Sequence, residues 1–403
     1  MTEKNFKIFK PQELSETQKN YIRASIPFLE ENGVTLTSQF YEYMLNNHKD
    51  VRPLFNETNQ KLLTQPKILA FSLLNYAKNI DDITPLVGFV RQIEEKHVAL
   101  QVEPYMYKIV GSCLLETMQK MLGVDASDPL IEAWTVAYGN LAQILIDAEH
   151  VLYLKNAWQG FRDFTVTRTV LEADDVKSVY FKPSDNGKLA PPKRGQSVCI
   201  RWSLPNEELE KSRQYSLSEY PSSNEYRISV RHIDGGLISS YVHEHLKAGD
   251  FIRVACPAGQ FVYDDSHESD NVVLFAGGIG ITPLIPIVDL ALKRNRKVSL
   301  FYSNKTVNNR PFGDWFRHLK KTYGNRFQLK EFLLRSKDTG TPIDEAFSRR
   351  LEEKDFDFVK GSKNIDIYML GPVPYMKFVK ENLVKRGLED SKIKSEFFGP
   401  YEV

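Results

Sequence analysis

Apolar residues recur at two different spacings along the chain, and the change falls near residue 155. Before it, they recur at helical spacing, and long strand-like runs are missing. After it, short alternating runs rich in β-branched residues lie between Gly, Pro and Asn turns, a pattern typical of an antiparallel barrel or sandwich. We expect strands there over 164–170, 176–181, 197–202 and 226–230.

From residue 271 the pattern changes again, because apolar strands now alternate with helical segments. Such alternation predicts a parallel, doubly wound α/β sheet. Its strands are expected over 272–276, 297–303, 327–332 and 365–370, and its last helix should reach Gly387. With linkers at 155–162 and 264–270, we predict an all-α domain over 1–153, an antiparallel β domain over 154–268 and an α/β domain over 269–403.

Composition and charge narrow the classes of partner. The formal net charge is +1, so no global field recruits nucleic acid or acidic membranes. The cysteines, Cys113, Cys199 and Cys256, are far apart and fit buried thiols in a reducing compartment. The uncharged run 272–288 is interrupted by Gly and Pro, which favours a strand, turn and helix over a membrane span. No targeting or lipidation signal is visible at either end, so we expect a cytoplasmic monomer that binds small molecules.

Polar groups occupy buried-face positions in the helical third. His97 lies on the apolar face of the helix expected over 84–102, Tyr107 on that of the next helix and Glu149 on the inner side of the last one. A buried carboxylate is costly unless it is hydrogen-bonded, so we expect the three groups to meet. An imidazole oriented by a carboxylate is typical of a metal ligand. The alternative is that each is an ordinary core residue, and the pattern alone does not name a metal.

Residues 12–153 resemble the globin of flavohaemoglobins. The matching segments are LTSQFY at 36–41, LFN at 54–56, 59–65, KH at 96–97, YKIVG at 107–111 and IDAE at 146–149. The resemblance implies haem b. It implies that His97 is the iron ligand and that Tyr107 and Glu149 form its hydrogen-bonded relay. It also assigns further residues to the haem pocket: Phe55 on the porphyrin, Tyr41, Gln65 and Leu69 on the distal side, and Lys96 among the cofactor-binding residues.

A strongly hydrogen-bonded proximal imidazole pushes electron density towards iron, which suits O–O chemistry better than oxygen storage. For Tyr41 and Gln65, ordinary core packing and a helix start are the alternative readings.

The middle third carries the segment RQYS at 213–216, which is expected to open a strand. It resembles the FAD signature of ferredoxin-reductase-like proteins. Arg213 would clamp the pyrophosphate, Tyr215 would lie along the flavin, and Ser216 would bond near its reactive nitrogen, with Gln214 in the same motif.

Two further segments follow in the family's order. In DGGLIS at 234–239, Gly236 and Ser239 would offer N–H groups to a phosphate at a helix start, although a plain hairpin turn is the alternative. CPAGQF at 256–261 is a turn that closes such a barrel. Ser197 and Gln260 depart from the family pattern near the flavin.

The last third begins with VVLFAGGIGITP at 272–283, which resembles the nicotinamide-nucleotide loop of the same superfamily. Gly278 and Gly280 would let the backbone approach a pyrophosphate, and Thr282 would cap a helix that begins at Pro283. The loop as a whole is assigned to the cofactor: Gly278, Ile279, Gly280, Ile281, Thr282 and Pro283.

The next strand ends without an acidic residue, in FYSNK at 301–305. Ser303, Lys305 and Arg310 could therefore hold a 2′-phosphate, and we expect NADPH to be accepted, with NADH as a further donor.

In IDIYMLGP at 365–372, Leu370 replaces a cysteine that relatives carry near the nicotinamide. The closing segment SEFFGP at 395–400 resembles the one whose aromatic covers the flavin, here Phe398. Glu396 would tune a redox potential, and Phe397, Gly399 and Pro400 belong to the same segment. Terminal core packing is the alternative for the two phenylalanines.

The resemblance spans about 12–400 and implies a nitric oxide dioxygenase. Hydride would pass from NAD(P)H to FAD, and single electrons from there to haem. O₂ held under Tyr41 and Gln65 would react with NO to give nitrate, with two NO and two O₂ consumed per NAD(P)H. The alternatives are a haem-based gas sensor or store, and a reductase for peroxides or external acceptors.

Overall fold

The computed structural model describes residues 6–55, 63–205, 207–266, 269–335, 342–359 and 364–396. The chain divides into two compact units. Of the described residues, the first unit holds those up to Phe161 together with Arg201–Arg213, and the second holds Arg162–Ile200 and the chain from Gln214 to Glu396.

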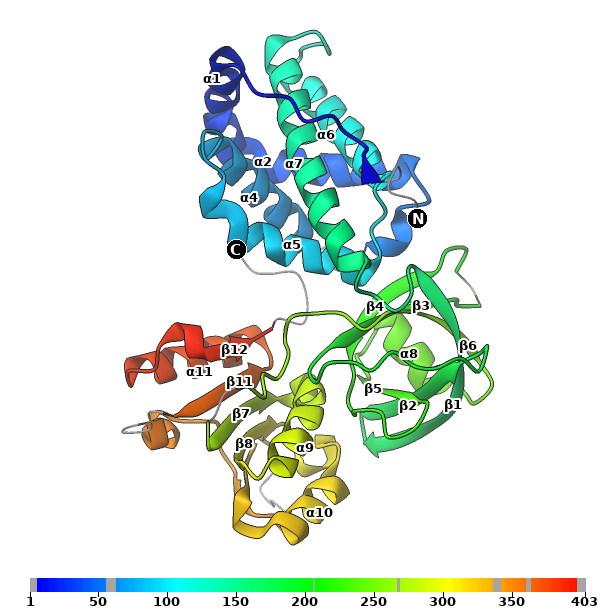
Figure 1. The fold of residues 1–403 in the computed structure, drawn as a ribbon, viewed down its shortest axis with the longest axis vertical. Coiled ribbons are helices and arrows are strands. Elements are labelled where there is room, and N and C mark those ends of the chain that lie inside the picture. Colours follow the sequence, from blue (N-terminus) through cyan, green and yellow to red (C-terminus); the bar gives the residue numbers. More distant parts are fainter. Residues whose placement is uncertain are drawn as a thin grey trace. The chain divides into compact units, whose positions relative to one another are not determined.

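The first unit is helical, as the apolar spacing predicts (Figure 1). The helix expected over 84–102 is α5, preceded by the short 3₁₀ helix η3. Helix α7 begins after Asp128, whose carboxylate accepts a hydrogen bond from the Leu130 N–H. The helices are α1 (Glu16–Ala24), α2 (Ile26–Asn47), η2 (Arg52–Leu54), α4 (Thr64–Lys78), η3 (Thr84–Leu86), α5 (Val87–Leu100), α6 (Met106–Leu122) and α7 (Pro129–Tyr153).

An antiparallel sheet follows, in the order β4-β3-β6-β1-β2-β5, with α8 (Leu237–Glu244) after its last strand. Strand β3 has the predicted bounds, whereas β1 is longer than predicted at both ends. The strand with the RQYS segment ends there rather than beginning, and β6 was not predicted. The strands are β1 (Phe161–Ala173), β2 (Val176–Pro183), β3 (Ser197–Trp202), β4 (Lys211–Ser216), β5 (Tyr226–Arg231) and β6 (Phe251–Ala255).

The last part of the chain forms a parallel sheet in the order β10-β9-β8-β7-β11-β12, which confirms the predicted doubly wound fold. Strands β10 and β12 were not predicted because they are short. The strands are β7 (Asn271–Gly277), β8 (Lys297–Asn304), β9 (Phe327–Leu333), β10 (Glu345–Phe347), β11 (Ile365–Leu370) and β12 (Ile393–Ser395). The helices are η4 (Gly278–Leu284), α9 (Ile285–Lys293), η5 (Val307–Asn309), α10 (Gly313–Tyr323), η6 (Gly324–Arg326), η7 (Glu353–Val359), α11 (Val373–Lys385) and η8 (Asp390–Lys392).

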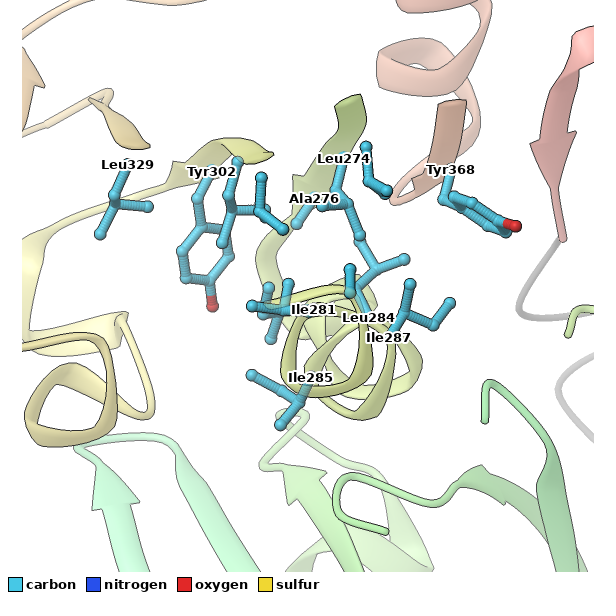
Figure 2. Close-up of a cluster of buried hydrophobic side chains, with 14 of the residues drawn as sticks. Leu274, Ala276, Ile281, Leu284, Ile285, Ile287, Tyr302, Leu329 and Tyr368 are labelled. Atoms are coloured by element: carbon cyan, nitrogen blue, oxygen red, sulfur yellow. The ribbon is translucent and has the colours of Figure 1, made fainter. Parts of the chain in front are cut away.

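Helices cover both faces of this sheet, which explains why its central strands read as apolar runs. On one face, side chains of η4 and α9 pack against β7 and β8, and Figure 2 shows Ile281 of η4 beside Tyr302 of β8. On the other face, α11 and η7 pack through a second apolar cluster that includes Phe275, Phe356 and Met376.

Candidate functional site

The three inward polar groups of the helical unit meet, as the sequence predicts. His97 Nδ1 lies 2.8 Å from the Tyr107 hydroxyl and 2.8 Å from Glu149 Oε1, and the Tyr107 hydroxyl donates to the same carboxylate oxygen at 2.5 Å. A carboxylate has no proton to give, so Nδ1 is the donor, and the neutral form of this imidazole has its lone pair on Nε2.

Glu149 and His97 of this triad differ in how far their side chains are buried. The Glu149 side chain is 1% exposed, whereas the His97 side chain is 30% exposed. Burial and the Glu149 charge raise the pKa of Tyr107 well above its usual value, so the phenol stays a donor. The imidazole is thus held at Nδ1 by a buried anion, while Nε2 makes no hydrogen bond with the described residues. This is the arrangement of a metal-ligating histidine with its orienting partner.

The side chains of Tyr153 and Gln101 hold the end of α5 by hydrogen bonds, an arrangement that was not predicted from the sequence and is called the clamp below. The Tyr153 hydroxyl donates to the Val102 carbonyl at 2.8 Å and approaches that of His97 at 3.4 Å. Gln101, in the left-handed conformation that ends α5, donates to Val98 O and accepts from the Gly160 N–H at 2.8 Å. The segment that carries His97 is therefore held by α7 and by the chain that follows α7 in the same unit. The spacing signal was available, because Tyr153 follows Glu149 by one helical turn.

The residues expected on the distal side belong to one apolar cluster. Tyr41 is buried, and its ring lies 5.6 Å from that of Phe55, edge to face. Leu69 packs against the same cluster from α4. Gln65 is half-buried in the first turn of α4, and Lys96 is half-buried beside His97. Burial raises the pKa of Tyr41, which keeps its hydroxyl protonated.

The RQYS segment lies at the end of β4. Ser216 is buried, and its hydroxyl makes no hydrogen bond of ordinary geometry within the described residues. Arg213 donates to the carbonyl of its neighbour Ser212 at 2.8 Å, and Gln214 and Tyr215 are half-buried. A buried hydroxyl without a protein partner is costly, so it fits a ligand that would satisfy it.

The other residues assigned to the flavin lie in turns and at a helix start. Ser197 pairs with Ala258 through two backbone hydrogen bonds, which places the CPAGQF turn beside β3. Helix α8 begins at Leu237, before Ser239, with Gly236 as its N-cap residue. The Ser239 hydroxyl accepts from the Ile233 N–H at 3.1 Å, so it ties the turn to the helix.

At the glycine turn, the expectation that Thr282 caps a helix beginning at Pro283 is wrong. A 3₁₀ helix, η4, runs through both residues, and α9 begins at Ile285 with Pro286 in its first turn. The Thr282 hydroxyl instead donates to the Ile279 carbonyl at 3.0 Å.

The glycines of this turn allow a close approach between segments of the protein itself. Gly278 has φ +56°, a conformation that favours glycine. A Cβ on Gly280 would lie 2.6 Å from the carbonyl oxygen of Leu370, the residue that replaces the family's cysteine. Gly280 therefore lets the turn lie against the end of β11.

Arg310 has a partner that was not predicted. Its Nη1 lies 2.8 Å from each oxygen of Glu331, and the side chains are 8% and 1% exposed. Ser303 is half-buried at the end of β8, and Lys305 is exposed. The signal for Glu331 was in the sequence, because it alternates in phase with the buried Leu329 and Leu333.

The structure describes the first two residues of the closing segment, Ser395 and Glu396. Glu396 is half-buried after β12. Phe397, Phe398, Gly399 and Pro400 lie outside the described residues, as do Asn56, Asn59 and Gln60.

Fold and triad together define a globin joined to a ferredoxin-reductase-like pair of domains. Family models agree with that division: a globin matches residues 38–145, an oxidoreductase FAD-binding domain matches 163–263, and an oxidoreductase NAD-binding domain matches 274–381.

Similar proteins identify the family. A flavohemoprotein of Candida albicans is 49% identical over 399 residues, which are 98% of this chain and 99% of that one. The structure of a flavohemoglobin from Malassezia yamatoensis, with bound FAD and heme, matches 96% of this chain and 100% of its own, with a TM-score of 0.81 and 26% identity. The flavohem-like FAD/NAD-binding domain of a nitric oxide dioxygenase from Vibrio cholerae matches 59% of this chain and 99% of its own, with a TM-score of 0.53 and 27% identity. This chain belongs to the flavohemoprotein family.

No helix within the described ranges is both long and apolar enough to cross a membrane.

Proposed function

We propose that the chain is a nitric oxide dioxygenase, with haem b over residues 1–153, FAD over 154–268 and NAD(P)H over 269–403. When bound, the flavin takes up a hydride and releases single electrons, and the haem iron supplies the centre at which NO and O₂ are converted to nitrate. The single observation that carries the proposal is the contact of His97, Tyr107 and Glu149 on the same chain as a flavin- and nucleotide-binding pair.

His97 would ligate the iron through Nε2. The residue types fit this role, because the imidazole presents a lone pair on a partly exposed edge while its other nitrogen donates to a buried carboxylate. Such a bond raises the basicity of the ligand nitrogen and favours O–O chemistry over reversible oxygen binding. Glu149 and Tyr107 therefore tune His97 and also fix its ring.

On the opposite side, Tyr41 would donate a hydrogen bond to a bound diatomic molecule. Its raised pKa keeps the donor proton at neutral pH, and Phe55 fixes its ring from the edge. Gln65, Leu69 and Lys96 would complete this pocket. The surrounding apolar cluster excludes water, which strengthens such a hydrogen bond.

In the reductase part, the buried Ser216 hydroxyl would bond the flavin ring, with Arg213 on the pyrophosphate and Gln214 and Tyr215 beside it. Ser197, Gly236 and Ser239 would line the rest of the flavin site. The turn from Gly278 to Pro283 would hold the nucleotide pyrophosphate. The closing segment, Glu396 to Pro400, would cover the flavin.

The test is anaerobic addition of NAD(P)H to the reconstituted protein, followed by NO and O₂. We expect the flavin and haem spectra to change in turn and nitrate to form. His97→Ala should still reduce its flavin but form no nitrate, whereas His48→Ala, a matched histidine of the same unit, should behave as wild type. Reduced haem without nitrate in the wild type would refute the dioxygenase and leave a sensor or store. Full activity of His97→Ala on another acceptor would indicate a reductase.

A further inference from the structure

A buried ion pair joins the loop after β8, the second strand of the parallel sheet along the chain, to the neighbouring strand β9. Arg310 lies between η5 and α10, and both oxygens of Glu331 on β9 lie 2.8 Å from its Nη1. With side-chain exposures of 8% and 1%, neither charge is open to water. A pair this deeply buried requires both partners, because removing either leaves an uncompensated charge.

The pair lies at the edge of the sheet where nucleotides bind. Glu331 follows the midpoint of β9, and the Arg310 guanidinium lies beside Gly313, the first residue of α10, with Nη2 3.0 Å from the position of a Cβ there. In doubly wound sheets the ribose of the adenosine half lies at the carboxyl end of the second strand, here β8. Arg310 is therefore placed where it could distinguish a 2′-hydroxyl from a 2′-phosphate.

Asn304, the last residue of β8, supplies a second observation. It is 5% exposed, and its amide lies beside the Tyr302 hydroxyl, although neither amide atom makes a hydrogen bond of ordinary geometry within the described residues. It stands at the strand end where dinucleotide-binding folds carry an acid that accepts the ribose 2′-hydroxyl. A neutral carboxamide can accept that hydrogen bond, and its own N–H groups can donate to the neighbouring 3′-hydroxyl.

We propose that Asn304 and the Arg310–Glu331 pair make NADH the preferred electron donor of this chain. The Asn304 amide takes the ribose diol, and Glu331 withholds Arg310 from a 2′-phosphate. Glu331 occupies Nη1 and neutralises the Arg310 charge, so a 2′-phosphate that contacted Nη2 or Nε would place a second anion beside the buried carboxylate. The exposed Lys305 remains available to a phosphate, but solvent screens its charge. This inference rests on the proposed function in one respect, namely that the bound nucleotide donates its hydride to the flavin.

The experiment measures binding of two adenosine probes, 5′-AMP and adenosine 2′,5′-bisphosphate, to the FAD-loaded full chain by calorimetry. For the wild type we expect 5′-AMP to bind more tightly. Glu331→Gln should raise affinity for the bisphosphate about ten- to a hundredfold and leave 5′-AMP unchanged, because one charge-assisted contact is freed. The ratio of kcat/KM for NADPH over NADH in anaerobic flavin reduction should rise equally. Asn304→Ala should weaken 5′-AMP binding.

Asp366→Asn is the matched control. Asp366 pairs with Arg296 at 3.4 Å, at side-chain exposures of 10% and 11%, and lies near the start of β11, at the opposite edge of the sheet. It should leave the probe ratio unchanged.

Tighter bisphosphate binding by the wild type would overturn the inference, and that result needs no variant to fold. So would an unchanged ratio in folded Glu331→Gln. Failure of the proposed function looks different, because the probes would still discriminate while NO and O₂ gave no nitrate.

Discussion

The relay behind His97 can be tested by removing one oxygen atom. Tyr107→Phe keeps the ring, which is 6% exposed, and deletes only the hydroxyl that donates to Glu149 Oε1 at 2.5 Å. A hydrogen bond to a charged group contributes about 1.5–3 kcal/mol, and the acceptor here is a buried carboxylate that keeps only His97 as a donor among these contacts. We therefore expect the helical unit to lose about 1.5–3 kcal/mol of stability.

Tyr138→Phe is the matched control. The Tyr138 hydroxyl donates to the backbone carbonyl of Tyr107 at 2.6 Å, so the same atom is deleted between the same two helices, but the acceptor is neutral. That bond should be worth about 0.5–1.5 kcal/mol.

The assay is native-state hydrogen exchange of the α6 and α7 amides, which reports the opening of the helical unit apart from the rest of the chain. Resonance Raman of the ferrous haem protein adds a second readout. The iron–histidine stretch should rise in Tyr107→Phe and stay unchanged in Tyr138→Phe, because only the first removes a competing donor and leaves Glu149 Oε1 a stronger acceptor for the His97 Nδ1–H. Equal losses in the two variants, with no change in that stretch, would refute the relay.

Three further predictions follow from other contacts. Gly280→Ala should abolish nucleotide-driven flavin reduction and retain FAD and haem, because its Cβ would lie 2.6 Å from the Leu370 carbonyl. Gly278→Ala, whose Cβ would meet only the flexible Arg231 side chain at 2.5 Å, should lower the rate of flavin reduction less. Equal rates in the two variants would contradict this. Burial lowers the pKa of His243 below its ordinary value of 6.5. Between the folded pKa and 6.5, the unfolded imidazole binds more protons than the folded one, so the free energy of unfolding is highest above pH 6.5 and falls as pH drops through the folded pKa. His243→Gln should flatten this dependence of the free energy of unfolding on pH, measured by urea unfolding. An unchanged dependence would exclude the assignment. Tyr153→Phe should lower the stability of the end of α5 by about 0.5–1.5 kcal/mol and speed exchange of the Val102 amide, with unchanged exchange counting against the clamp.

The amino-acid sequence by itself determined the elements and their faces. Helical spacing placed His97, Tyr107 and Glu149 on inner faces, and a buried carboxylate needs donors, so their meeting could be predicted before any coordinates. Alternation and apolar runs likewise predicted both sheets, since a strand buried on one face differs in pattern from one buried on both. The glycine turn was visible because so few residues tolerate close backbone approach.

Only the tertiary structure decided which charged groups became partners. Glu331 lies on a strand distant in sequence from the Arg310 loop, so the pairing depends on the register of β9 against β8. The start of α9 was set in the same way, because packing of η4 under β7 overrode the helix signal of Thr282 and Pro283. Local sequence sets propensity and face, whereas partner choice arises from contacts between distant segments, which no local pattern encodes.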